Sequence, residues 1–342
     1  MRKTWLAALA VVLAVPLTGI GTYKFLLSPV SKHGKTQLVA IKPGTGVIGI
    51  CEQLEREHLV RSGLMLSIWL RLHDDDRSLK AGAYALSPAM SAPAIAEAMI
   101  EGKAQGDRLT VPEGFSMHQI ADLLDHQSPG SGKRFLNLAS RASAYASEFP
   151  FLAGLPANAT LEGFLFPDTY VLTPDAQREQ SLIRMMLTRF QQLAVPVYDQ
   201  SSHHALGLLQ TITLASIVEK EAAHAEERPL IAGVFFNRLA AHMPFGSDPT
   251  VEYALHRHED ARGLSLRDVA VNSPYNTYKH VGLPPGPIAN PGLASIEAVL
   301  QPARTPYMYF VARGDGTHAF TRDYKDHLAA QRQILLSQRA GR

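Results

Sequence analysis

The sequence predicts an α+β protein in three parts: an N-terminal transmembrane helix, a small β-α-α-β unit and a larger mixed α+β domain. An almost uncharged run occupies 5–27, apolar residues recur with helical spacing in many later segments, and short β-branched segments end in turns rich in Gly and Pro. The length of 342 residues exceeds one typical small domain, so we expect two folded units behind the N-terminal run.

Composition narrows the possible functions. Hydrophobic residues make up 46% of the chain and charged residues 19%, which is enough apolar material for packed cores. The 33 Lys and Arg residues nearly balance 31 Asp and Glu residues, and no long basic block occurs. Proteins that bind nucleic acid usually carry a basic stripe, so we expect no nucleic-acid partner. The single cysteine, Cys51, allows no intramolecular disulfide and is expected to be a buried structural thiol.

The segment 5–27 is predicted to be an uncleaved membrane anchor behind a cytoplasmic tip at 1–4. About 20 apolar residues span a bilayer as a helix, and Arg2 and Lys3 place the N-terminus in the cytoplasm. The alternative is a cleaved signal peptide, which needs a shorter apolar region and a small-residue cleavage site. The sequence YKFLL follows instead and is unfavourable for cleavage. We therefore expect a single-pass protein of the cell inner membrane whose remaining chain lies in the periplasm.

Two folded regions are predicted behind the anchor. A polar linker at 28–36 leads to a unit at 37–103, read as strand, helix, helix and returning strand, with one more helix after it. Its acidic turn at 74–76 lacks the spacing of an EF-hand calcium site, so we expect a solvated turn. The residues 104–342 are predicted to form the larger domain.

The larger domain is predicted to be rich in helices. Helices are expected at 179–193, 206–223, 226–242 and 323–337, with a break at Pro196 and a hairpin between Tyr307 and Thr321. The stretch 272–292, NSPYNTYKHVGLPPGPIANPG, is too rich in Asn and Pro for a regular core element. Rigid loops with amides and aromatic rings resemble the walls of sugar-binding clefts, although a long structural loop is also possible.

Common catalytic motifs are absent from the sequence. There is no G-x-S-x-G elbow of a serine hydrolase and no HExxH motif. The histidines at 203, 204, 256 and 258 lack the helical i, i+4 spacing of metal ligands. We therefore expect no metal and no cofactor.

Two carboxylates at the end of an apolar helix, Glu219 and Glu221 in TLASIVEKEAA, are the candidates for acid–base chemistry. Residues two apart on a helix point about 160° away from each other, so they cannot share a proton. Both have largely apolar neighbours, which raise a carboxyl pKa and make a general acid available near neutrality. Periodicity alone does not choose between them, and a solvated helix end is the ordinary alternative.

Seven motifs in order carry a resemblance to a known family. They are LEGFLFPDTY, LASIVEKEA, FFNRL, SDPTVEYAL, SPYNTY, GLPPGPIANPG and TPYMYFVA with GTHAFT. From about 37 to 335 the chain resembles the YceG-like family of endolytic murein transglycosylases, called MltG, with a LysM-like subdomain at 37–103. Asn290 departs slightly from the family pattern, in which small residues are also usual.

The resemblance implies a lytic transglycosylase, a carbon–oxygen lyase that cleaves the β-1,4 bond between MurNAc and GlcNAc in nascent glycan strands and limits their length. It implies that Glu219 is the catalytic acid and base. Such an enzyme needs only one carboxylate, because the C6 hydroxyl of the substrate attacks the anomeric carbon and leaves a 1,6-anhydro-MurNAc end. The motifs also suggest substrate-binding residues: Ser247, Asp248, Thr250, Asn276, Tyr278 and Pro285.

The expected partners are peptidoglycan glycan strands, together with peptidoglycan synthases (penicillin-binding proteins) at the same membrane. Two alternatives to the transglycosylase stay open. A peptidoglycan hydrolase would use Asp248 or Glu252 as a second carboxylate. A wall-binding scaffold anchored to the membrane would have no catalytic residue.

Overall fold

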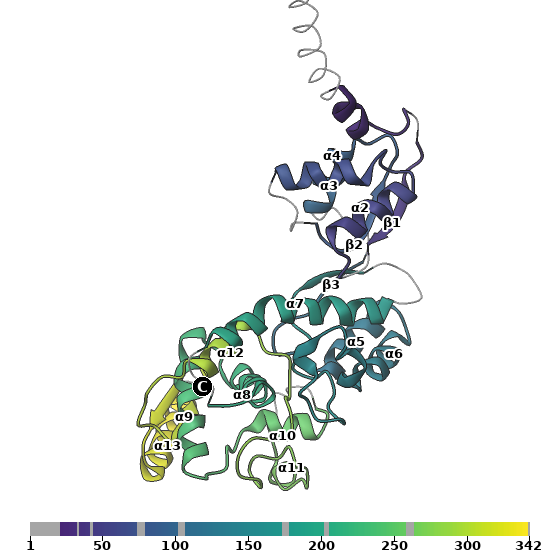
Figure 1. Cartoon of the computed structure of the whole chain (residues 1–342). Helices are drawn as coiled ribbons and strands as arrows, with labels where there is room; N and C mark the ends of the chain where they lie inside the picture. The colour runs from purple at the N-terminus through teal and green to yellow at the C-terminus, as the bar shows by residue number, and fades with distance from the viewer. Residues whose placement is uncertain are drawn as a thin grey trace, which may run out of the picture. The chain divides into compact units, whose positions relative to one another are not determined.

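The computed structural model describes residues 21–32, 34–41, 44–73, 79–101, 107–172, 178–201, 205–257 and 263–340 (Figure 1). The fold class is mixed α+β and rich in helices, and within these ranges the sheets are three separate two-stranded pairs. The chain divides into two compact units. The first contains the described residues up to Leu109 together with Tyr170–Ser181, and the second contains Thr110–Thr169 and the described residues from Leu182 onward.

The first unit has the predicted order strand, helix, helix, strand, followed by a further helix. Its elements are β1 (Gln37–Ile41), α2 (Val47–Arg56), α3 (Gly63–Leu72), β2 (Gly82–Leu86) and α4 (Ala92–Ile100). The strands β1 and β2 pair antiparallel, with Gln37 opposite Leu86. The hydroxyls of Ser62 and Ser91 cap α3 and α4 by accepting bonds from backbone N–H groups. Cys51 is buried, as expected for a structural thiol.

The end of the predicted anchor and the linker after it pack on the first unit. Residues 21–27, which the prediction placed in the membrane, are helical, and Leu27 is buried in the core of this unit. Arg61 donates hydrogen bonds to the carbonyls of Pro29 and Val30 at 2.8 and 3.1 Å, and its guanidinium stacks on the Phe25 ring. Within the described ranges, no helix is both long and apolar enough to cross a membrane. The predicted anchor lies outside those ranges for residues 5–20.

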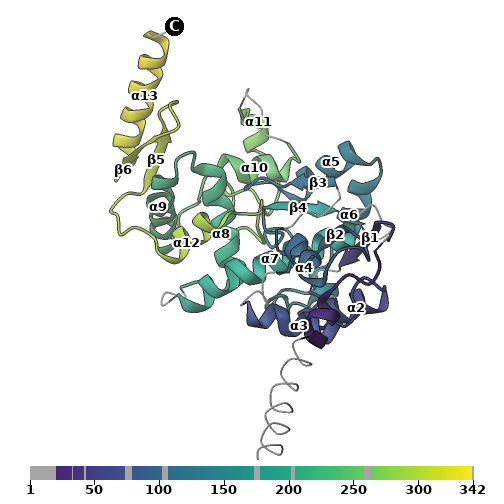
Figure 2. The ribbon, with the colours of Figure 1, turned by 90° about the horizontal axis from the view of Figure 1, so that it is seen from above.

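The second unit is built mainly of helices. Its elements include α5 (Met117–Gln127), α6 (Ser131–Ala139), α8 (Leu208–Glu221), α9 (Arg228–Ala240), α10 (Asp248–Ala254), α11 (Leu266–Val269) and α12 (Leu293–Leu300). Figures 1 and 2 show α8 in the middle of this unit, and it packs against α9, α10 and α12. Because other helices pack around α8, the side chains at its end are held in fixed positions. The strands β3 (Asp107–Thr110) and β4 (Thr169–Leu172) form a further two-stranded sheet, most of whose residues belong to the first unit.

Two expectations for this region are wrong. The helix α7 (Arg178–Gln200) continues through Pro196, which lies inside it, so the predicted break does not occur. The stretch 272–292 forms no regular element before α12, as predicted, but it is not excluded from the core. Asn276 and Asn290 are fully buried there, and their side-chain amides donate to backbone carbonyls of Val269 and Phe115.

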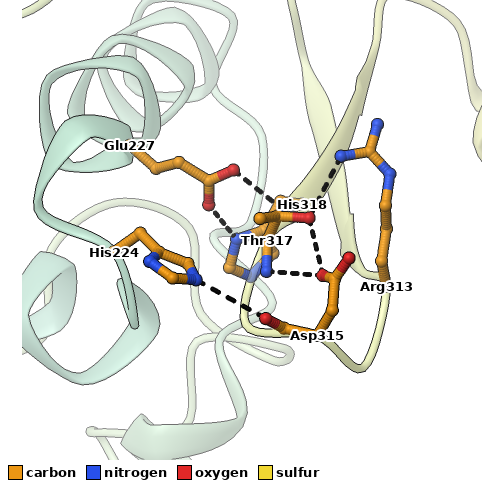
Figure 3. A network of polar contacts seen from close by, with 6 residues as sticks. All are labelled: His224, Glu227, Arg313, Asp315, Thr317 and His318. Carbon is orange, nitrogen blue, oxygen red and sulfur yellow. Dashed lines mark hydrogen bonds and ion pairs between the residues drawn. The ribbon is translucent and has the colours of Figure 1, made fainter.

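The C-terminal region forms the predicted hairpin and final helix. The strands β5 (Tyr309–Ala312) and β6 (His318–Thr321) pair antiparallel, and α13 (Tyr324–Ala340) packs against both. A polar network fastens the hairpin to the turn before α9 (Figure 3). In it, Glu227 accepts a bond from the backbone N–H of His318 at 2.9 Å and pairs with the His318 ring at 2.6 Å.

Candidate active site

The helix α8 presents three consecutive polar residues at its C-terminal end. Its residues 211–218 are all buried, so the helix is surrounded by protein on every side before it ends. Glu219, Lys220 and Glu221 then follow and are partly buried. The hydroxyl of Ser216 accepts a bond from the backbone N–H of Ile288 at 3.0 Å. These contacts hold the helix end rigidly within the second unit.

The carboxyl of Glu219 is occupied by structural contacts. One oxygen accepts bonds from the Gly292 N–H at 3.0 Å and the Ser295 hydroxyl at 2.7 Å. The other oxygen pairs with Arg228 at 3.2 Å, and the side chain of Glu219 is only 7% exposed. Gly292 is the N-cap of α12, so Glu219 lies at the positive end of that helix. An arginine, two donors and a helix N-terminus surround this carboxyl, so protein groups already engage both of its oxygens.

A second carboxylate, Glu113, lies beside the same arginine. Partial burial and the nearby charge of Glu219 raise the pKa of Glu113, while Arg228 opposes this shift. Glu113 also explains the glycine at the start of α12, because a Cβ at Gly292 would come within 2.1 Å of the Glu113 carboxyl. Glu113, Glu219 and Arg228 therefore form a tight charged cluster that joins three segments of the second unit.

The carboxyl of Glu221 has very different surroundings. Within the described chain its one hydrogen-bond donor is the hydroxyl of Ser247, at 2.6 Å. Burial raises the pKa of Glu221 to about 7, and the charges of Asp248 and Glu252 add to the rise, while Ser247 and Arg238 oppose it. A carboxyl with a pKa near neutrality can be protonated before a reaction and ionised after it. General acid–base catalysis needs this property.

Ser247 is held in place by buried threonines. Its backbone N–H donates to the Thr277 hydroxyl at 3.0 Å, and its carbonyl accepts from the Thr250 hydroxyl at 2.7 Å. The two threonine hydroxyls bond to each other at 2.8 Å. Ser247 therefore contacts Glu221 directly, whereas Thr250 lies behind it and supports it. Both had been predicted to bind substrate, and the contacts of Thr250 give it a structural role.

The other predicted binding residues also include both residues that a ligand can reach and a buried residue with structural contacts. Tyr278, whose side chain is in part exposed, donates from its hydroxyl to exposed Asp248 at 2.5 Å, and these two groups lie where a ligand can reach them. Pro285 is also exposed. Asn276 is not, because its amide nitrogen donates to the carbonyls of Val269 and Val271, both at 2.8 Å. We therefore assign Asn276 a structural role in place of the predicted contact with substrate.

A cavity of about 240 Å³ lies at this end of α8. It is lined by Gly114, Ser116, His118, Gln119, Asp122, Lys220, Pro249, Glu252, Tyr253, His256, Arg257 and Ile288. Lys220 is adjacent in sequence to both glutamates, and the charge of Glu252 acts on Glu221. Four of the lining residues, Gly114, Ser116, His118 and Gln119, come from the stretch VPEGFSMHQ at 111–119, which was not predicted to belong to this site. In the described chain no group of three or more His, Cys, Asp and Glu residues is arranged to hold a metal.

Comparison with known proteins identifies the family. The YceG-like family matches over residues 39–333, which is most of the chain. The chain belongs to the YceG-like family. The resemblance predicted from the sequence motifs is therefore confirmed.

Relatives of this YceG-like protein include named proteins and a solved structure. It is 32% identical over 324 residues to the endolytic murein transglycosylase of Bacillus subtilis (strain 168), covering 92% of this chain and 89% of that protein. The endolytic murein transglycosylase of Streptococcus pneumoniae strain D39 is 33% identical, covering 89% of this chain, but the chain spans only 60% of that protein. A 2.6 Å crystal structure of a YceG-like protein from Listeria monocytogenes is 32% identical with a TM-score of 0.60, covering 87% of this chain and 100% of that one.

Proposed function

We propose that this YceG-like protein is an endolytic murein transglycosylase, which cleaves the β-1,4 bond between MurNAc and GlcNAc within peptidoglycan glycan strands. The names of its relatives support this activity. The substrate is peptidoglycan, and the products carry 1,6-anhydro-MurNAc ends. The enzyme limits the length of nascent strands.

Glu221, and not Glu219, is our candidate for the acid and base. The observation that carries this choice is its carboxyl, which has a pKa of about 7 and a hydrogen bond from Ser247. Glu219, the residue that the sequence analysis assigned, is paired with Arg228 and accepts bonds from Gly292 and Ser295. We give Glu219 the positioning role of holding the end of α8 against α9 and α12.

The reaction needs two proton transfers. Protonated Glu221 donates its proton to the glycosidic oxygen as the bond to the anomeric carbon breaks. The C6 hydroxyl of the same MurNAc then attacks that carbon, and ionised Glu221 takes the hydroxyl proton. No water is consumed, and Glu221 ends protonated for the next cycle.

Incubation of the full-length protein with uncrosslinked glycan strands, followed by mass spectrometry, tests the activity. A transglycosylase gives products whose reducing ends lack one water. Products heavier by one water would instead support a hydrolase that uses Asp248 or Glu252 as a second carboxylate. No product from the folded protein would support a wall-binding scaffold.

The cellular setting is part of the same proposal. The apolar run at 5–27 anchors the protein in the inner membrane with a single pass, and Arg2 and Lys3 keep its N-terminus in the cytoplasm. The remaining chain lies in the periplasm, where glycan strands are made. The first unit is a LysM-like module that binds or places the strand, and peptidoglycan synthases at the membrane are partners.

A further inference from the structure

A buried carboxyl beneath the cavity has no part in the proposed chemistry. Glu162, from the motif LEGFLFPDTY, is 3% exposed and does not line the cavity. In the described chain its hydrogen-bond donors are all neutral groups. Burial raises the pKa of Glu162 to about 8, while those bonds oppose the rise. A carboxyl placed here without a cation is costly, so its contacts indicate what it does.

The two oxygens of Glu162 collect donors from three segments of the second unit. Both accept from the backbone N–H of Met117, at 2.9 and 3.1 Å. One also accepts from the Asn290 amide at 3.2 Å, and the other from the Tyr253 hydroxyl at 3.2 Å. The carboxyl offers two oxygens that accept these bonds, whereas a glutamine amide has one oxygen and an NH₂ group that cannot accept.

Each of these three donors belongs to a wall of the cavity. Met117 is the first residue of α5, and its neighbours Ser116 and His118 line the cavity. Tyr253 of α10 lines it directly. Asn290 follows the lining residue Ile288 by two positions, and its main chain is bonded to Phe115 and Gly114. One carboxyl therefore sets the distances between the start of α5, the C-terminal end of α10 and the loop before α12.

We propose that Glu162 is a positioning residue for glycan cleavage, which fixes the cavity walls so that a glycan strand lies in register with Glu221. The proposal rests on the proposed function, because it takes this cavity as the place where the strand binds. A misplacement of about 1 Å can cost roughly 10²-fold in rate, so a residue that never touches substrate can still control turnover.

Two matched variants test this role. Glu162→Gln removes a carboxylate that accepts a backbone N–H beneath the cavity. Glu227→Gln removes a carboxylate that accepts the His318 N–H in the network of Figure 3, which has no residue in the cavity lining. The two changes are chemically the same and each costs stability. Both full-length variants are assayed for release of anhydro-muramyl ends from uncrosslinked glycan strands, alongside thermal melts.

We expect Glu162→Gln to lower kcat/KM by about 10- to 100-fold, with a higher KM, at a temperature where it is fully folded. The kcat/KM of Glu227→Gln should stay within about twofold of wild type, since Glu227 bonds the C-terminal hairpin and does not line the cavity. Equal activity of the two folded variants would overturn the proposal. Tyr253→Phe provides a second readout: it should lower kcat/KM on its own but add little to Glu162→Gln, because both changes break the same bond.

Amide hydrogen exchange tests the positioning role of Glu162 independently of the proposed function. If the wild-type protein releases no anhydro ends, the transglycosylase proposal fails. The exchange rates of the two variants then test by themselves whether Glu162 fixes the cavity walls. Faster exchange at 116–119 and 253–257 in Glu162→Gln, but not in Glu227→Gln, supports the positioning of the walls. Unchanged exchange in both ranges would overturn it. If Glu162→Gln does not fold, Tyr253→Phe carries the same comparison.

Discussion

The hydroxyl of Ser247 donates a 2.6 Å hydrogen bond to the carboxyl of Glu221, and Ser247 is the residue directly before α10. Two residues earlier on α8, the carboxyl of Glu219 contacts α12 and Arg228 instead. One helix end therefore carries two carboxyls with different surroundings. Several protein groups bond to the carboxyl of Glu219, whereas the carboxyl of Glu221 is bonded to Ser247 and has a pKa raised to about 7.

Replacement of the two glutamates by glutamine tests which one transfers protons. An amide keeps the shape of the side chain but cannot deliver a proton, and such a step is worth roughly 10²- to 10⁴-fold. We expect Glu221→Gln to lose activity at the upper end of this range, because one group serves both transfers. Glu219→Gln should lose less activity but more stability. Release of anhydro-muramyl ends and thermal melts decide this, and the reverse pattern in folded proteins would return the assignment to Glu219.

The rate should depend on pH through Glu221. Its pKa is raised from 4.5 to about 7, and the first step needs the protonated form. Activity on glycan strands is therefore expected to be high below pH 7 and to fall as the pH rises through about 7. A rate profile measured between pH 5 and 9, on protein shown to be folded throughout, checks this. An alkaline limb centred well away from 7 would contradict the assignment of Glu221.

Removal of the Ser247 hydroxyl should move that profile. The bond from Ser247 stabilises the charged form of Glu221 and lowers its pKa. In Ser247→Ala the pKa of Glu221 should rise further, so the alkaline limb should shift to higher pH. Ser140→Ala, which removes an exposed hydroxyl bonded to the Asn137 carbonyl, is the control and should leave the profile in place. Identical profiles for the two variants would show that the bond is not functional.

Arg228 should matter to stability far more than an exposed arginine does. Its pair with Glu219 is 13% and 7% exposed, whereas the pair of Arg189 with Asp168 is 42% and 38% exposed. Loss of Arg228 leaves buried acceptor oxygens of Glu219 without one of their donors, so Arg228→Gln should cost about 1 to 3 kcal/mol in the free energy of unfolding. Arg189→Gln should cost less than about 1 kcal/mol. Denaturant unfolding compares them, and equal losses would contradict the structural role given to Glu219.

The predicted anchor should be present in the mature protein. The YKFLL sequence at 23–27 occupies the place where a signal peptide would be cut. N-terminal sequencing of the protein extracted from membranes should find the start of the chain before residue 18. A start between 18 and 35 would show that the segment is removed.

Local signals were sufficient to predict much of the fold. Ser116 and Gln119 form the capping box that begins α5, and Gly314 and Gly316 have the positive φ angles that the hairpin turn requires. Such features depend only on residues close in sequence. The break predicted at Pro196 does not occur, because α7 continues through this residue. Tertiary packing, and not the local sequence, determines that continuation.

The candidate site could be predicted only in part, because its chemistry depends on distant contacts. Sequence spacing placed both glutamates at the end of α8, but it could not show that Arg228 and Ser295 take one carboxyl and Ser247 the other. Likewise, nothing local distinguishes buried Asn276 from exposed Tyr278, although they lie in one motif. Burial and long-range hydrogen bonds determine these roles.

Residues 27–30 are bound to the first unit, so they do not form a flexible linker between that unit and the apolar run before it. Leu27 is in the core of the first unit, and Arg61 holds the carbonyls of Pro29 and Val30. If the part of the apolar run before residue 21 spans the bilayer, few residues separate the lipid from this folded unit. The first unit would then lie close to the membrane surface, where it would meet glycan strands near the site of their synthesis and not in the mature wall farther out.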